Sequence, residues 1–130
     1  MSEKIEAKRI ALIVEDNAEL RTLAATLLEE AAFEVVEVGS GEEALHYLYH
    51  HAEEVAFLFA DVRLPYLLSG VDLAHRVQLK WPWIRTVLTS GAPLEGELYE
   101  APKDVPFMPK PWRALDVLVE AERAAKAHPL

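Results

Sequence analysis

The sequence predicts a single-domain α/β protein in which helices cover both faces of a parallel five-stranded sheet. Three observations predict this class. Short apolar segments alternate along the chain with segments whose apolar residues recur at helical spacing. The apolar segments are too uniformly hydrophobic for strands with one face in solvent. Finally, 130 residues, 52% of them hydrophobic, are enough for one compact domain with a core but too few for a second domain.

Composition and charge exclude several classes of function. The chain has no cysteine, which rules out disulfides, thiolate catalysis and cysteine-ligated metals. With 22 acidic and 13 basic residues, its formal net charge of -9 would repel a phosphate backbone, so we expect no direct binding to nucleic acid. There is no signal-peptide core, and no apolar run reaches the roughly 18 residues of a membrane span. We therefore expect a cytoplasmic protein without membrane contact.

The first strand-helix unit follows a polar segment, residues 1–8, which we expect to be disordered. Residues 10–14 are apolar and predict a strand that ends at Glu15 and Asp16. A helix should follow, because leucine and alanine then recur at helical spacing. On this local pattern alone, Asp16 with Glu19 three residues later fits a capping box, so the pair could simply mark the start of the helix.

The second unit consists of a predicted strand at residues 33–38 and a predicted helix at residues 42–51. The third strand, residues 55–60, is apolar throughout, which is typical of a strand buried on both faces. This strand delivers Asp61 to its C-terminal end. Open α/β sheets keep their binding and catalytic groups at that edge.

The remaining elements become less regular toward the end of the chain. We predict a third helix from Gly70 and a fourth strand at residues 84–89. Glycines and prolines in residues 91–104 indicate that any fourth helix there is short or irregular. Residues 105–108 predict a fifth strand, and the proline inside it favours the edge of the sheet. The last helix is predicted to start at Pro111.

Two residue sets suggest further ligand sites when taken alone. His46 and His50 lie four positions apart on the second predicted helix, but no acidic residue or third histidine accompanies them there, so we expect no metal at this position. Trp81, Trp83 and Trp112 are interpreted as packing or helix-end residues rather than as a ligand cage.

The expected arrangement of five such units places the polar residues at one edge of the sheet. Right-handed crossovers leave few topologies, of which the flavodoxin-like strand order 2-1-3-4-5, here with about five helices, is the commonest at this size. Glu15 and Asp16 would then lie beside Asp61, with Ser90 and Lys110 at the same edge. Three converging carboxylates need a cation between them, and Mg²⁺ suits oxygen ligands and phosphate. Asp61 could then act as a nucleophile toward phosphorus.

Four motifs together resemble the receiver domain of two-component response regulators over residues 9–126, with residues 127–130 as a tail. Each motif follows a predicted strand. In chain order they are Glu15-Asp16-Asn17, Asp61 with Leu64-Pro65, Thr89-Ser90-Gly91 and Lys110-Pro111. The resemblance covers both single-domain receivers and receivers of the hybrid-kinase type.

The resemblance implies roles for the residues of the acidic cluster. Asp61 would be the phosphoacceptor and Asp16 a direct ligand of Mg²⁺. Glu15 would bind the metal through water, and the backbone carbonyl of Arg63 would be a further ligand.

The resemblance also implies how the site responds. Ser90 would be the switch hydroxyl, Lys110 would sense the phosphoryl group, and the bond from Lys110 to Pro111 would be cis. Phe107 occupies the aromatic switch position, which is often a tyrosine in the family, so no phenol hydroxyl can report the state. The loop from Asp61 to Gly70 is one residue longer than the commonest family spacing, a variant associated with hybrid histidine kinases.

The function implied is a phosphorylation-controlled switch rather than a metabolic enzyme. A histidine kinase or histidine phosphotransfer protein would donate the phosphoryl group, and an unidentified output protein would respond; a homodimer stays open. The alternatives are a phosphate-independent interaction module of the same fold and a phosphatase with an aspartyl intermediate. The complete set of site residues argues against the first. The second usually needs an extra general acid, and Arg63 stands two residues after Asp61.

Overall fold

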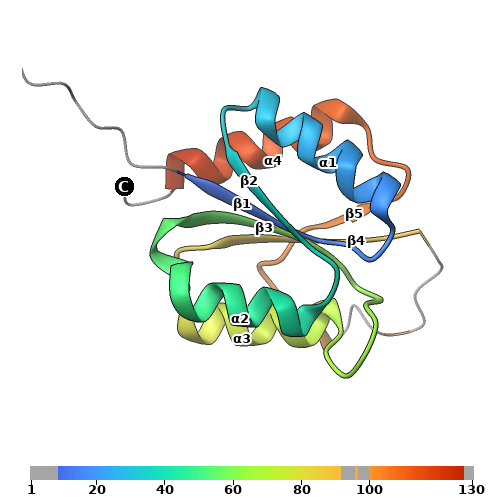
Figure 1. Ribbon diagram of the computed structural model, residues 1–130, viewed down its shortest axis with the longest axis vertical. Helices are drawn as coiled ribbons and strands as arrows, with labels where there is room; N and C mark the ends of the chain where they lie inside the picture. Colours follow the sequence, from blue (N-terminus) through green and yellow to red (C-terminus); the bar gives the residue numbers. More distant parts are fainter. Residues whose placement is uncertain (1–8, 92–95, 97–99, 128–130) are drawn as a thin grey trace, which may run out of the picture.

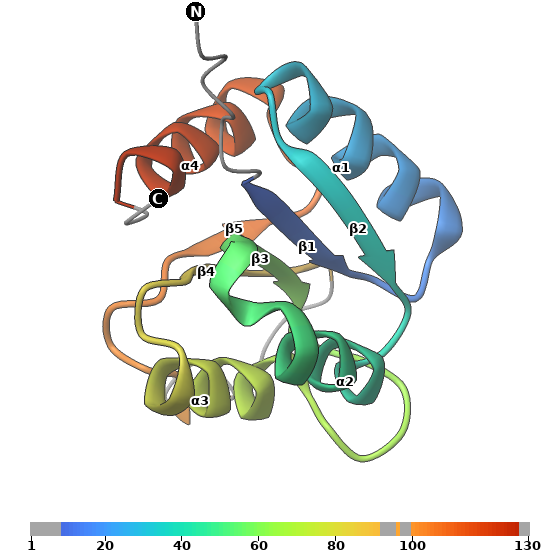
Figure 2. The ribbon, with the colours of Figure 1, turned by 60° about the vertical axis from the view of Figure 1, so that its left-hand side comes forward.

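A parallel sheet with two helical layers makes up the computed structural model, which describes residues 9–91, 96 and 100–127. Its elements, in chain order, are β1 (Ile10–Val14), α1 (Ala18–Glu30), β2 (Glu34–Val38), α2 (Gly41–His51), the 3-10 turn η1 (Ala52–Glu54), β3 (Val55–Asp61), α3 (Gly70–Lys80), β4 (Arg85–Ser90), β5 (Phe107–Pro109) and α4 (Ala114–Ala127). Figures 1 and 2 show α1 and α4 on one face of the sheet and α2 and α3 on the other. In the described residues, no helix is long and apolar enough to cross a membrane.

The sheet has the order β2-β1-β3-β4-β5, and every neighbouring pair of strands is parallel. The predicted flavodoxin-like fold is therefore confirmed, including the position of the fifth strand at an edge. Because all strands run in one direction, their carboxyl ends lie along one edge of the sheet. This edge receives the residues that follow β1, β3, β4 and β5.

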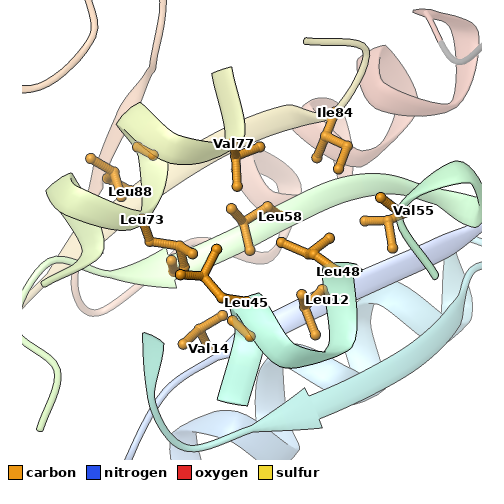
Figure 3. Close-up of a cluster of buried hydrophobic side chains, with 14 of the residues drawn as sticks. Leu12, Val14, Leu45, Leu48, Val55, Leu58, Leu73, Val77, Ile84 and Leu88 are labelled. Atoms are coloured by element: carbon orange, nitrogen blue, oxygen red, sulfur yellow. The ribbon is translucent and has the colours of Figure 1, made fainter. Parts of the chain in front are cut away.

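The central strand β3 is buried over its whole length, as its apolar sequence predicts. Alternate side chains enter two separate cores. Val55 and Leu58 point toward α2 and α3, as Figure 3 shows. Phe57 and Phe59 enter the core under α1 and α4, where their rings stack with centroids 6.1 Å apart. Truncating Leu58 to alanine would cost about 2 to 5 kcal/mol of stability, because no solvent reaches it.

Polar side chains fix the start of three helices. Asn17 caps α1 by accepting a hydrogen bond from the backbone N–H of Leu20 at 3.0 Å. Ser40 caps α2, and Ser69 forms a capping box with Asp72 at the start of α3. The interpretation of Asp16 as a helix cap is therefore wrong, because the neighbouring Asn17 has that role.

The end of the chain differs from the predicted boundaries. The fifth strand spans Phe107–Pro109 rather than 105–108, because Val105 turns back to donate to the carbonyl of Pro102 at 3.2 Å. The last helix begins at Ala114 and not at Pro111. Lys110 still follows the sheet, and the first helical hydrogen bonds go to the carbonyl of Arg113. The predicted disordered segment 1–8, half of the region 91–104 in which a short fourth helix was predicted, and residues 128–130 lie outside the described residues.

Candidate functional site

Three strands deliver the charged residues of the site to the carboxyl edge of the sheet. Glu15 directly follows β1 and is held there by a backbone hydrogen bond to Val38 of 3.1 Å. Asp61 is the last residue of β3, and Lys110 directly follows β5. Since β3 lies between β1 and β4, the two carboxylates meet as predicted.

The ammonium of Lys110 bridges the two buried carboxylates. It lies 2.5 Å from Glu15 Oε1 and 2.7 Å from Asp61 Oδ2. Glu15 is only 3% exposed and Asp61 7%. Charged groups at this depth need close partners of opposite charge, and Lys110 supplies one to both carboxylates.

Burial and pairing shift the pKa values of Glu15 and Lys110. Burial raises the pKa of Glu15, and the neighbouring Asp61 charge adds to this, while Lys110 and the backbone N–H of Asn17 oppose it. Burial alone would lower the pKa of Lys110, but the hydrogen bonds to Asp61 and Glu15 outweigh it and raise that pKa. Lys110 therefore stays charged at neutral pH.

Asp16 completes an acidic group at this edge. One carboxylate oxygen each from Glu15, Asp16 and Asp61 lie within 4.8 Å of one another. Asp16 is exposed, whereas the other two are buried. Mg²⁺ prefers oxygen ligands and keeps several of its waters, so a site with carboxylate oxygens and one side open to solvent fits this ion.

The turn after β3 positions the Asp61 side chain. The backbone N–H of Arg63 donates to Asp61 Oδ1 at 3.0 Å, so both carboxylate oxygens have a donor. The side chain of Arg63 is exposed. Gly70 closes the loop by donating to the carbonyl of Val62 at 2.8 Å. A Cβ at Gly70 would lie 2.1 Å from the carbonyl oxygen of Asp61, which explains why glycine stands at this position.

The structure brings Ser90 to the same edge and places Phe107 further down the sheet. Ser90 is buried at the end of β4, and its carbonyl accepts the backbone N–H of Lys110 at 3.0 Å. Phe107 pairs with Leu88 at the start of β5, and its ring is 36% exposed. The bond between Lys110 and Pro111 is cis, as the resemblance implies.

Two supporting residues near the site did not emerge from the sequence. Arg21 of α1 donates to the backbone carbonyl of Glu15 at 2.9 Å and lies 3.6 Å from the carboxylate of Glu37. Glu42 of α2 accepts from the backbone N–H groups of Leu67 and Leu68, each at 3.0 Å. These contacts join different helices, strands and loops, so no local spacing in the sequence predicts them.

The family model described as response regulator receiver domain matches residues 11–105. The chain belongs to this receiver domain family. The buried Lys110 bridge and the acidic group around Asp61 are therefore found in a receiver domain of two-component systems. The resemblance to receiver domains that the sequence motifs indicate is confirmed.

Two curated relatives and a solved structure illustrate how this receiver domain relates to others. It is 28% identical to the response regulator receiver protein CpdR of Brucella abortus, over 89% of this chain and 95% of CpdR. It is 32% identical over 63 residues to the CAI-1 autoinducer sensor kinase/phosphatase CqsS of Vibrio cholerae, which is 48% of this chain but only 9% of CqsS. The signal receiver domain of an HD domain-containing protein from Pseudomonas fluorescens superposes with a TM-score of 0.83 at 19% identity, covering 93% of this chain and 97% of the other.

Proposed function

We propose that this receiver domain is a phosphoryl-accepting switch of a two-component system or phosphorelay. In this proposal Asp61 accepts a phosphoryl group in the presence of Mg²⁺, and the modified domain changes its affinity for a partner. The supporting observation is the Lys110 ammonium, which bridges Glu15 and Asp61 beside the exposed Asp16. This arrangement supplies a nucleophile, oxygen ligands for a cation and a fixed positive charge in one place.

The proposed reaction transfers phosphorus from nitrogen to oxygen. A lone pair of an Asp61 carboxylate oxygen forms the new O–P bond. The P–N bond of a phosphohistidine breaks, its electron pair stays on the imidazole nitrogen, and that nitrogen takes up a proton. The reverse of the switch is hydrolysis, in which water attacks phosphorus and releases inorganic phosphate and the Asp61 carboxylate.

The residues around Asp61 would stabilise the phosphoryl oxygens. Lys110 is already 2.7 Å from Asp61 Oδ2 and would turn its charge toward the new group. Glu15 and Asp16, with Asp61 and the carbonyl of Arg63, would hold Mg²⁺. When bound, the ion neutralises part of the charge on the transferring group. The Ser90 hydroxyl would donate to a remaining oxygen.

The proposed output is read on the face that contains β5. Movement of Ser90 toward the phosphoryl group would pull on Lys110, whose backbone is hydrogen-bonded to Ser90. Phe107 lies three residues before Lys110 on the same strand segment, and it has no hydroxyl with which to form a new hydrogen bond. The change at Phe107 would therefore be a change in the burial of an apolar ring.

The same proposal implies which proteins are the partners and where in the cell the protein acts. The donor would be a histidine kinase or a histidine phosphotransfer protein, which agrees with the partial similarity to CqsS, a protein named as a sensor kinase. The output protein would be a separate partner or a second copy of this chain. We propose a cytoplasmic protein that takes part in its own phosphorylation and dephosphorylation and has no metabolic substrate.

Intact mass measurement tests the proposal. The protein would be incubated with a small-molecule acyl phosphate and Mg²⁺, beside an Asp61→Asn control. We expect one added phosphoryl group that requires Mg²⁺ and is absent from the control. If no adduct forms, a direct Mg²⁺ titration separates rapid hydrolysis from an inactive site. A protein that neither gains mass nor binds Mg²⁺ would be a phosphate-independent interaction module instead.

A further inference from the structure

Trp112 makes a side-chain hydrogen bond beside the site that the phosphoryl chemistry does not explain. Its indole Nε1–H donates to the hydroxyl of Thr89 at 2.6 Å. Thr89 is only 2% exposed, and Trp112 is half-buried. A buried hydroxyl needs a partner, and here it obtains one from a residue 23 positions later in the chain.

The backbone of Thr89 is also bound to β3, the strand that ends at Asp61. It pairs in register with Asp61, and its carbonyl accepts the backbone N–H of Val62 at 2.8 Å. The next residue, Ser90, accepts the backbone N–H of Lys110 at 3.0 Å. Thr89 therefore joins the end of β3 by its backbone and the segment after Lys110 by its side chain.

The indole ring itself lies close to one core residue, Phe59, and to one site residue, Lys110. Its centroid is 5.0 Å from that of Phe59, two residues before Asp61, at an interplanar angle of 56°. The ammonium of Lys110 lies over the ring at 6.0 Å from the centroid. This distance is at the outer limit of a cation–π attraction, so the ring contributes to the surroundings of the ammonium as well as to packing.

We propose that Trp112 is a positioning residue for Lys110. By holding the Thr89 hydroxyl, it fixes the segment after β5 against β4, and this sets where the Lys110 ammonium stands relative to Asp61 and Glu15. The inference rests on the proposed function for its kinetic consequence, but the contact itself can be tested without phosphorylation. It assigns the tryptophan a role beyond the packing expected from the sequence.

The kinetic test compares rates of phosphoryl incorporation from an acyl phosphate with Mg²⁺. Trp112→Phe keeps an aromatic ring but removes the donor, and Thr89→Val removes the acceptor at similar volume. We expect each to slow incorporation about 3- to 10-fold, the factor that corresponds to one hydrogen bond. The double variant should be no slower than either single variant, because the two residues act through one contact. Thr89→Ser, which keeps the hydroxyl, should react at the wild-type rate.

Trp83→Phe is the matched control. The Trp83 indole donates to the carbonyl of Ala52 at 3.1 Å, away from the carboxyl edge, so its loss should leave the rate unchanged. Thermal melts by circular dichroism would establish that each variant is folded at the assay temperature. Equal slowing in Trp83→Phe, or additive losses in the double variant, would mean that Trp112 acts only through stability and would overturn the inference.

A second measurement does not depend on phosphorylation. The three indole N–H resonances of the ¹⁵N-labelled protein can be assigned from the Trp→Phe variants. We expect Thr89→Val and Lys110→Met each to shift the Trp112 resonance more than that of Trp83. If the wild-type protein neither takes up a phosphoryl group nor binds Mg²⁺, the proposed function fails and this resonance alone decides the inference. A Trp112 resonance that stays in place in either variant overturns it.

Discussion

Lys110 and Glu15 lie 95 positions apart in the chain, and their side chains form a 2.5 Å ion pair at the carboxyl edge of the sheet. The same ammonium reaches Asp61, so one lysine pairs with two buried carboxylates. Asp61 cannot be understood as an isolated nucleophile, because it shares the Lys110 ammonium with Glu15 before any phosphoryl group arrives. The predictions below begin with this bridge and move outward to the residues that support it.

Replacing Lys110 with methionine should lower stability and make it depend on Mg²⁺. The substitution leaves two buried carboxylates without their cation, which we expect to cost about 1 to 3 kcal/mol in the absence of metal. Added Mg²⁺ should recover more stability in Lys110→Met than in the wild type, because it would restore a positive charge. Urea unfolding with and without Mg²⁺ measures both quantities. Wild-type stability in Lys110→Met without metal would show that the bridge contributes nothing.

Replacing Asp16 with asparagine should have the opposite effect on stability. Asp16 adds a third negative charge within 4.8 Å of the other carboxylate oxygens, so its neutralisation relieves repulsion. We expect Asp16→Asn to be as stable as the wild type or more so without Mg²⁺, and to lose Mg²⁺ binding. Unfolding curves and calorimetric titration with Mg²⁺ test this. A destabilised variant that still binds Mg²⁺ would contradict the metal site.

Gly70→Ala, which adds one methyl group near the site, should strongly lower the stability of the protein. The new Cβ would meet the Asp61 backbone oxygen at 2.1 Å, so either α3 or the end of β3 must move. We expect a loss of about 3 kcal/mol or more. Gly39→Ala is the control, because its Cβ would meet only the flexible end of Arg21 at 3.7 Å. Denaturant midpoints of the two variants should differ clearly, and similar midpoints would contradict the close approach.

Glu42 should make stability depend on pH. Hydrogen bonds from its own backbone and from Leu68 and Leu67 hold the pKa of this carboxyl below its unfolded value of 4.5, against the opposing effect of desolvation. The charged form is therefore favoured in the folded state, and its contribution is complete well above 4.5 and disappears as the pH falls through the folded pKa. Glu42→Gln should thus be less stable than the wild type at neutral pH, with the difference shrinking in acid. Urea unfolding across this range would measure it.

Glu29→Gln provides the comparison for this pH effect. Glu29 is exposed on α1, so its substitution should change stability little across the same pH range. A pH-independent difference for Glu42→Gln as well would mean that the loop contact does not favour the charged form.

Arg85→Met should weaken the attachment of α4 to the sheet. Arg85 at the start of β4 contacts Glu120 of α4 through Nη2 at 2.7 Å and Nε at 2.8 Å, and both side chains are largely shielded from solvent. We expect a loss of about 1 kcal/mol, most of it absent when Glu120→Gln is already present. Arg113→Met, which breaks an exposed pair with Asp116, should cost almost nothing. Equal losses in the two variants would contradict the role of burial.

The sequence predicts the central strands β1 and β3 well because each begins as a continuous apolar run, which is typical of a strand buried on both faces. Strand order then followed from general rules, and with it the convergence of Glu15, Asp61 and Lys110. The helix start at Asn17 was missed because Asp16 fits the same capping pattern one position earlier. A local pattern cannot decide which of two adjacent residues caps a helix when both Asp and Asn have side chains that can accept the capping hydrogen bond.

The contacts of Arg21, Glu42 and Trp112 could not be predicted for a different reason. Glu42 reaches backbone groups 25 and 26 positions away, and Trp112 reaches Thr89 at a separation of 23. Such hydrogen bonds depend on the position of a loop or the orientation of a ring after the helices and strands have packed. The fifth strand and the last helix shifted for a similar reason, since backbone bonds to Ser90 and Arg113 decide where the chain leaves the sheet.

We expect the position of Lys110 after β5 also to affect how the protein folds during synthesis. A ribosome releases β1, β3 and β4 first, and these strands carry Glu15 and Asp61 without their counter-charge. Docking β1 beside β3 at that stage would bury two like charges. The electrostatics thus disfavour a partly built sheet and favour completion of the domain in one cooperative step once β5 emerges. The lysine that pairs with both buried carboxylates would thus also tie assembly of the site to the arrival of β5.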